Sequence, residues 1–230
     1  IVERGYVGDF AITGEPTNLH IGIQAKGVLA MRIDVRGRSA HGSTPWLGDN
    51  AVLKAVDVFR GIETLPFTRE SSEMFDRPSI SLGRILGGDA INRVPDHCAI
   101  DVDIRYLPGQ DADEILAAIG ALEGAEIAHV FHREPIVVDR EQPHVRLLAD
   151  AVAAVTDGGE SIAVGRDGTS DVISFIRAGV PGVEFGPAGE GHHGPAEWVS
   201  IDSLARYRDA LVRFVDSIAQ DARRTDLRIA

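Results

Sequence analysis

Residues 97–106, which read HCAIDVDIRY, decide how the middle of this chain folds. Small or apolar side chains stand at every second position from Cys98 to Ile104, and they alternate with Ala99, Asp101, Asp103 and Arg105. This alternation is typical of a β-strand that has one face on a hydrophobic core and the other in water. The sequence therefore predicts an antiparallel sheet with one solvated face.

The segments around this strand complete a six-element pattern. Alternation recurs at 29–35, and 79–86 and 125–131 also have the composition of strands. Asp49 or Asn50 is placed to cap a helix after the first strand, and Asp111 begins a capping-box-like segment before a second helix. The order from 29 to 135 is β-α-β-β-α-β, which predicts a ferredoxin-like unit with both helices on one face of the sheet.

The outer segments, 1–28 and 136–230, alternate short strands with helices, which predicts an α/β layer. Strands are expected at 6–13, 161–164 and 180–185, a helix opening at 168–170, and a final amphipathic helix from about residue 200. The fold class is therefore α/β, with the ferredoxin-like unit inserted. With three or four short strands the layer is incomplete, so we expect part of it to be missing from this sequence.

Composition excludes several function classes. The 230 residues carry a formal net charge of −12, whereas a protein that binds nucleic acid or an anionic membrane needs a basic face. No apolar run approaches the roughly 18–20 residues of a membrane span. The single cysteine, Cys98, excludes an intramolecular disulfide framework and fits a reducing compartment, so we expect a cytoplasmic protein.

Two segments carry candidate metal ligands. Glu15 follows a predicted strand, where a carboxylate points into the usual ligand crevice of an open α/β sheet, and Pro16 stiffens the turn. The alternative is an ordinary turn glutamate. His192 and His193 lie in a glycine-rich loop, and imidazole is the commonest transition-metal ligand, although a solvated pair of histidines explains them equally.

Other residues suggest sites for anions. Gly168, Thr169 and Ser170 combine hydroxyls with the predicted start of a helix, which favours an anion site or plain N-capping. Arg105 has the guanidinium that clamps a carboxylate in bidentate fashion, or it is simply the partner of a neighbouring aspartate. His41, in the segment Ser39–Ser43, is indistinguishable from a surface histidine when taken alone.

Several enzyme classes have no signature here. The chain has no G-x-S-x-G nucleophile elbow, and the glycines at 83–88 fit neither a dinucleotide-binding loop nor a P-loop. It also has no H-E-x-x-H motif, and one cysteine cannot supply a cysteine-rich zinc site.

Taken together, the motifs resemble the zinc-dependent aminoacylase/carboxypeptidase family, which includes acetylornithine deacetylase and succinyl-diaminopimelate desuccinylase. Each motif is weak alone, but their order and spacing agree over nearly the whole chain. The matching segments are DFAITGEPT at 9–17, GRSAH at 37–41 with Pro45, Gly48, Asn50 and Ala51, Gly87-Gly88 with Asn92 and Pro95, Arg105, GTSD at 168–171, and Gly186-Pro187 followed by His193 and Glu197.

The resemblance implies a catalytic α/β domain, at 1–28 and 136–230, interrupted by a ferredoxin-like lid at 29–135. It implies two divalent metal ions, zinc or else cobalt or manganese, with Glu15 a terminal ligand of one ion and His193 of the other. His193 is preferred to His192 because the family's ligand stands four residues before a glutamate. The resemblance places His41 at a neighbouring subunit's active site, where it stabilises an oxyanion.

The resemblance also implies what is bound and cleaved. Asn92, Arg105 and the segment Gly168, Thr169 and Ser170 would hold the carboxylate end of an N-acyl amino acid or small peptide. The reaction would be amide hydrolysis by a metal-activated water, with a glutamate as general base. The lid usually forms the interface of a homodimer, and neither nucleic acid nor a membrane is expected as a partner.

Departures from the family pattern set a further expectation. The upstream His-x-Asp, the bridging aspartate and the Glu-Glu pair that supplies the base have no counterpart before Gly14. We therefore expect a C-terminal portion that is inactive and binds metal weakly on its own. The alternatives are a non-catalytic dimerisation or binding module derived from such a hydrolase, and a dipeptidase rather than a biosynthetic deacylase.

Overall fold

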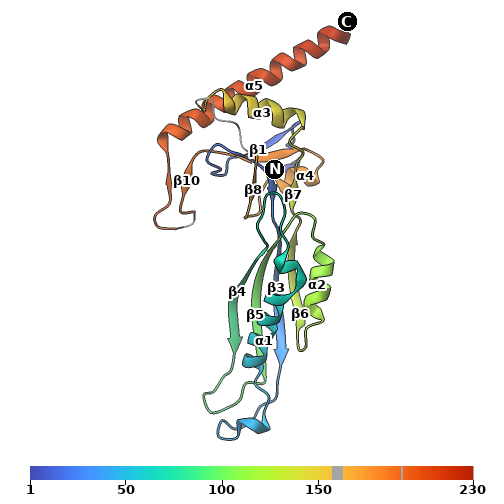
Figure 1. Ribbon diagram of the computed structural model, residues 1–230, viewed down its shortest axis with the longest axis vertical. Helices are drawn as coiled ribbons and strands as arrows, with labels where there is room; N and C mark the ends of the chain where they lie inside the picture. Colours follow the sequence, from blue (N-terminus) through green and yellow to red (C-terminus); the bar gives the residue numbers. More distant parts are fainter. Residues whose placement is uncertain (157–162, 193, 230) are drawn as a thin grey trace. The chain divides into compact units, whose positions relative to one another are not determined.

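The computed structural model describes residues 1–156, 163–192 and 194–229, which form two compact units (Figure 1). Unit 1 comprises Ile1–Ala25, Ile136–Arg166 and Ser170–Ala230, and unit 2 comprises Lys26–Pro135 with Asp167–Thr169. None of the described helices combines the length with the apolar character that a membrane span requires.

Unit 2 has the predicted ferredoxin-like order. Its four strands form one antiparallel sheet in the order β4-β5-β3-β6, which places the first and third strands of the unit in the centre. The elements are β3 (Gly27–Arg36), α1 (Ala51–Thr64), β4 (Ser79–Gly87), β5 (His97–Tyr106), α2 (Ala112–Gly120) and β6 (Glu126–Arg133).

The core of unit 2 lies between the sheet and its two helices, which cover the same face of the sheet (Figure 1). The residues predicted to point inward from β3 and β5 are buried in one cluster with residues of α1 and α2, namely Leu29, Met31, Ile33, Val35, Cys98, Ile100, Val102, Ile104, Ile62 and Ile119. Burying each large aliphatic side chain stabilises the fold by about 1.5–3 kcal/mol. The opposite face carries Asp101, Asp103 and Arg105, so the prediction of one solvated face is confirmed.

Both helices of unit 2 begin at side-chain caps. The Asn50 Oδ1 atom accepts hydrogen bonds from the backbone N–H groups of Val52 and Leu53, which selects Asn50 over Asp49 as the cap of α1. Asp111 accepts two backbone N–H groups in the same way at the start of α2. These carboxylate and amide oxygens satisfy donors that the helix itself leaves without partners.

The described residues of unit 1 form a mixed sheet flanked by helices. The sheet follows the order β1-β9-β2-β7, with β8 also paired to β2, and a separate hairpin joins β10 and β11. The elements are β1 (Ala11–Thr13), β2 (Ile21–Ala25), β7 (Ile136–Val137), α3 (Pro143–Ala153), β8 (Ala163–Arg166), α4 (Ile173–Arg177), β9 (Gly182–Phe185), β10 (Gly189–Glu190), β11 (Trp198–Val199) and α5 (Ile201–Ile229). The predicted α/β class with an inserted ferredoxin-like unit is confirmed.

Three predicted elements of unit 1 differ from the structure. The strand expected at 6–13 is confined to β1, because only Ala11 to Thr13 pair with β9, while Tyr6 and Val7 are exposed. The strand expected at 161–164 corresponds to β8, which spans Ala163–Arg166. Residues 161 and 162 of the expected strand lie outside the described residues. The helix expected to open at 168–170 begins instead at Ile173.

Candidate functional site

Two parallel strand ends form the candidate site in unit 1. Strands β1 and β9 run side by side, with Thr13 opposite Glu184. Glu15 stands two residues beyond the end of β1, and the glycine-rich loop that leads to His192 starts at Gly186, directly after β9. The carboxyl ends of neighbouring parallel strands meet at one edge of a sheet, which is where open α/β sheets bind ligands.

Gly186 packs directly against the backbone of Glu15. A Cβ atom on Gly186 would collide with the Glu15 carbonyl oxygen, so glycine is required by this close approach. The Gly186 N–H donates to the Thr17 hydroxyl at 3.0 Å, and the Leu19 N–H donates to the Gly186 carbonyl at 3.0 Å. The turn that carries Glu15 and the start of the loop after β9 are therefore held as one body.

The ion pair between Arg166 and Glu184 also holds the Glu15–Pro16 turn. Arg166 Nε donates to Glu184 Oε2 at 3.0 Å, and its Nη2 donates to the Pro16 carbonyl at 3.0 Å. Glu184 is buried, so the guanidinium both neutralises a buried carboxylate and fixes the turn. Sequence reasoning missed this pair, although a glutamate inside the apolar strand Val183-Glu184-Phe185 was a signal that it needs a buried partner.

The two predicted metal ligands have different outcomes. Glu15 is exposed and lies just beyond the end of β1, and its role as a ligand stays a prediction. His193 lies outside the described residues, so the structure does not place it. Within the described parts of the chain, no three His, Cys, Asp or Glu side chains gather in a way that would hold a metal ion.

The segment 168–170 does not begin a helix, because Ser170 forms a turn of its own. The Ser170 hydroxyl accepts a hydrogen bond from the Val172 N–H at 3.2 Å, and α4 starts only after Val172. Ser170 is buried and its Oγ lies 3.3 Å from Thr13 Oγ1, next to the end of β1. In unit 2, Thr169 Oγ1 is buried without a hydrogen-bond partner, an arrangement that an additional bound group would satisfy.

His41 and Asn92 lie together at one end of the sheet in unit 2. The loop after β3 and the loop before β5 are joined because the Gly42 N–H donates to the Asn92 carbonyl at 2.7 Å, and His41 pairs with Arg93. The Ser39 hydroxyl donates to Asp96, and this hydrogen bond lowers the pKa of the Asp96 carboxyl. The loops that carry His41 and Asn92 are therefore joined through their backbones.

Arg105 lies toward the other end of the sheet. It is eight residues along β5 from His97, a distance of about 27 Å at the usual rise of a strand. Its guanidinium makes two hydrogen bonds to the Asp103 carboxylate, at 2.7 and 3.1 Å. Within one copy of the chain, Arg105 and Asn92 do not converge on a single ligand.

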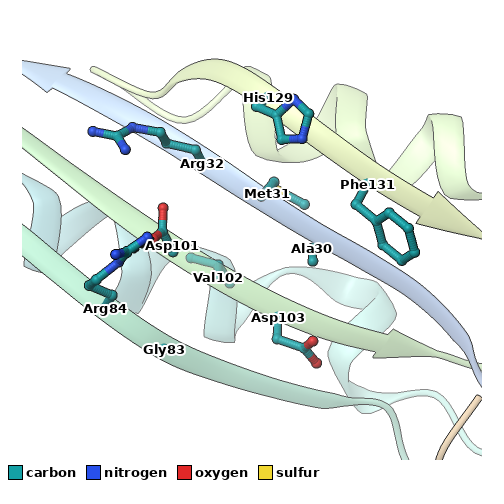
Figure 2. A pocket seen from close by; sticks show the side chains of 10 residues that line it. All are labelled: Ala30, Met31, Arg32, Gly83, Arg84, Asp101, Val102, Asp103, His129 and Phe131. Carbon is teal, nitrogen blue, oxygen red and sulfur yellow. Dashed lines mark hydrogen bonds and ion pairs between the residues drawn. The ribbon is translucent and has the colours of Figure 1, made fainter.

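A cavity of about 450 Å³ lies on the solvated face of the same sheet (Figure 2). Ala30 and Gly83, which have little or no side chain, line its base. His129 and Phe131 from β6 line one side. Arg84 and Asp101 form an ion pair of 2.6 Å at the other side. None of the predicted site residues lines this cavity, although Asp103, the partner of Arg105, does.

The fold defines an α/β protein with an inserted ferredoxin-like unit. A comparison with protein families finds a match that falls largely within that inserted unit. Residues 23–126, which include most of unit 2, match the M20 peptidase dimerisation domain. This part of the chain is therefore similar to the dimerisation domain of M20 peptidases.

Named relatives extend the likeness beyond that domain. The chain is 30% identical to an acetylornithine deacetylase of Proteus mirabilis, over 91% of this chain and 56% of that protein. It is 28% identical to a succinyl-diaminopimelate desuccinylase of Gluconacetobacter diazotrophicus, over 94% of this chain and 58% of that protein. The chain thus spans less than two thirds of the length of these relatives.

Solved structures agree with the fold. A tripeptidase from Staphylococcus aureus matches 96% of this chain and 60% of its own, with a TM-score of 0.75 and 17% identity. An M20 family metallo-carboxypeptidase from Sulfolobus solfataricus matches 92% of this chain and 64% of its own, with a TM-score of 0.69 and 15% identity. The predicted resemblance to the aminoacylase/carboxypeptidase family is confirmed, with homologues that are deacylases and desuccinylases.

Proposed function

We propose that this chain is part of a metal-dependent hydrolase that cleaves the amide bond of an N-acyl amino acid or a small peptide. The observation that carries the proposal is the contact of Gly186 with the Glu15 backbone, which joins the two strand ends from which ligands are expected. Relatives named for deacetylation of acetylornithine and desuccinylation of succinyl-diaminopimelate support the substrate class.

We further propose that Glu15 and His193 each bind one of two divalent ions, most simply zinc. A bound ion of this kind supplies an acidified water for attack on an acyl carbon. The exposed carboxylate of Glu15 fits the role of a terminal ligand, and the Arg166–Glu184 pair holds its turn. Since zinc in catalytic sites takes three protein ligands, the remaining donors are expected from polypeptide beyond these 230 residues.

The protein is proposed to act as a homodimer through unit 2. Strand β4 forms an edge of the sheet and is largely exposed, and edge strands are commonly covered by a second copy. In such a dimer His41 is proposed to reach the partner's active site. The Gly42–Asn92 hydrogen bond supports the proposal that Asn92 reaches the same site, whereas Arg105, at the far end of β5, would contact the substrate from the other copy.

Arg105 and the segment Gly168–Ser170 remain proposed contacts for the carboxylate of the substrate. The unpartnered Thr169 hydroxyl supports this role, because a buried oxygen without a partner is normally satisfied by a bound group. Asp103, which the Arg105 guanidinium now holds, would have to release one of its two hydrogen bonds to admit a substrate carboxylate.

Hydrolysis assays on the complete encoded protein test the proposal. A panel of N-acetyl amino acids, N-succinyl amino acids and short peptides should yield amine release that chelators abolish. The 230-residue chain alone is expected to show none, and robust zinc-dependent deacylation by it would contradict that expectation. A complete protein that forms dimers yet hydrolyses no member of the panel would favour the non-catalytic dimerisation module.

A further inference from the structure

The imidazole of His41 is held by a residue that the sequence did not single out. The Ser43 backbone N–H donates to His41 Nδ1 at 3.1 Å, and the Ser43 hydroxyl oxygen lies 2.8 Å from the same nitrogen. Both contacts come from one residue two positions further along the chain. They leave the rest of the exposed ring facing solvent.

The backbone contact determines which ring nitrogen carries the proton. An N–H group can only donate, so Nδ1 must offer its lone pair to Ser43. In a neutral imidazole one nitrogen is a donor and the other an acceptor, so the proton lies on Nε2. The Ser43 hydroxyl can donate to the same lone pair and strengthens this preference.

The turn around His41 is fixed independently of the ring. The Thr44 N–H donates to the His41 carbonyl at 2.9 Å, and the Thr44 hydroxyl donates to the same carbonyl at 3.4 Å. The Gly42 N–H is bound to the Asn92 carbonyl at 2.7 Å. Among the residues that the structure describes, no group bonds to Nε2 of His41, so its N–H is available to a bound molecule.

We propose that Ser43 is a positioning residue that locks His41 in the tautomer with the proton on Nε2. A neutral ring in this tautomer presents a fixed donor to an oxygen that gains negative charge. The tautomer follows from the local geometry alone, and its catalytic consequence rests on the function proposed above. Ser43 acts through His41 and does not itself contact the reacting atoms.

Nitrogen-15 NMR of the histidine rings, at a pH where they are neutral, tests the tautomer directly. The His41 signals are assigned by their loss in His41→Gln. The wild-type ring should show Nδ1 as an acceptor and Nε2 as the protonated nitrogen. Ser43→Ala keeps the backbone N–H and removes the hydroxyl donor, so it should move both nitrogens part of the way toward the values of a freely exchanging ring, whereas Ser43→Thr should restore them.

Thr44→Val is the matched control, because it removes a hydroxyl from the same turn without touching the ring. It should leave the His41 nitrogen signals unchanged. The tautomer is refuted if Nδ1 is the protonated nitrogen in the wild type, and the role of the Ser43 hydroxyl is refuted if Ser43→Ala also leaves the signals unchanged. A merely structural role for Ser43 would alter stability without shifting the ring nitrogens.

The kinetic arm uses the complete encoded protein. Ser43→Ala should lower kcat about tenfold with little change in KM, a smaller loss than the about 10²–10³-fold expected when an oxyanion donor is removed outright by His41→Ala. An NMR result as expected, with no hydrolysis by the wild type, would refute the proposed function and uphold the tautomer. Hydrolysis that depends on His41, with unchanged ring signals in Ser43→Ala, would refute only the role of Ser43.

Discussion

Gly186 lies so close to Glu15 that a methyl group on Gly186 would overlap the Glu15 carbonyl oxygen. The contact joins the end of β1 to the start of the loop after β9, although the two residues are far apart in the sequence. It is the structural basis for assigning both segments to one site, and it makes the site sensitive to a single methyl group.

Gly186→Ala should therefore destabilise unit 1 and displace the Glu15 turn. Overpacking in a tight backbone contact typically costs about 1–3 kcal/mol, and we expect the upper end because the atoms in conflict are backbone atoms. The urea midpoint of the variant measures the cost. Gly8→Ala is the control, since its added Cβ would meet only the Phe10 carbonyl oxygen, at 3.8 Å, and an equal loss in both variants would contradict the account.

Arg166→Ala should destabilise the protein more than an exposed ion pair would suggest. The change leaves the buried Glu184 carboxylate unpaired and removes a donor from the Pro16 carbonyl, and breaking a buried pair costs about 3–5 kcal/mol. Urea unfolding measures the loss. Arg60→Ala, which breaks the exposed pair with Glu63, should cost at most about 1 kcal/mol. Similar losses in the two variants would mean that Arg166 does not support the turn.

We expect the protein to lose stability at high pH because the pKa of Tyr106 is raised in the folded state. Burial, followed by the nearby charges of Glu134 and Asp111, raises the pKa of its phenol to about 12. A group whose pKa is higher in the folded state favours folding while protonated, so its contribution is complete below the unfolded-state pKa of about 10 and is lost as the pH rises from about 10 to about 12. Urea midpoints across this range should fall in the wild type.

Tyr106→Phe should remove that part of the pH dependence, at some cost because the bond to His132 Nε2, 2.7 Å long, is also lost. Tyr6→Phe is the control, since Tyr6 is exposed and should change the profile little. A wild-type midpoint that stays flat from about pH 10 to about 12 would show that Tyr106 does not stay protonated in the folded protein.

The architecture of unit 2 could be predicted because local signals agree with the global fold. The alternation from Cys98 to Ile104 fixes which face is buried, and the cap at Asn50 fixes where α1 begins. When local preferences agree with the global fold in this way, the fold can be predicted from the sequence. The same reasoning placed Glu15 after a strand, because Gly14 and Pro16 end β1 locally.

Other features depend on partners distant in sequence and could not be predicted. Tyr6 and Val7 have the composition of a strand, but strand formation needs a pairing partner and β9 reaches only Ala11 to Thr13. The turn formed by Ser170 competes with the helix expected there, because a serine hydroxyl can satisfy a nearby backbone N–H. The Arg166–Glu184 pair joins two strands, so Glu184 alone indicated a buried partner but not which residue it is.

The central claim is that Glu15 belongs to a metal site in the complete encoded protein. The direct measurement is the bound metal content of that protein and of its Glu15→Gln variant, after dialysis against trace zinc, with Glu3→Gln as the matched control. We predict that Glu15→Gln loses one of two bound ions while Glu3→Gln retains both. Equal metal content in Glu15→Gln and the wild type would contradict the account.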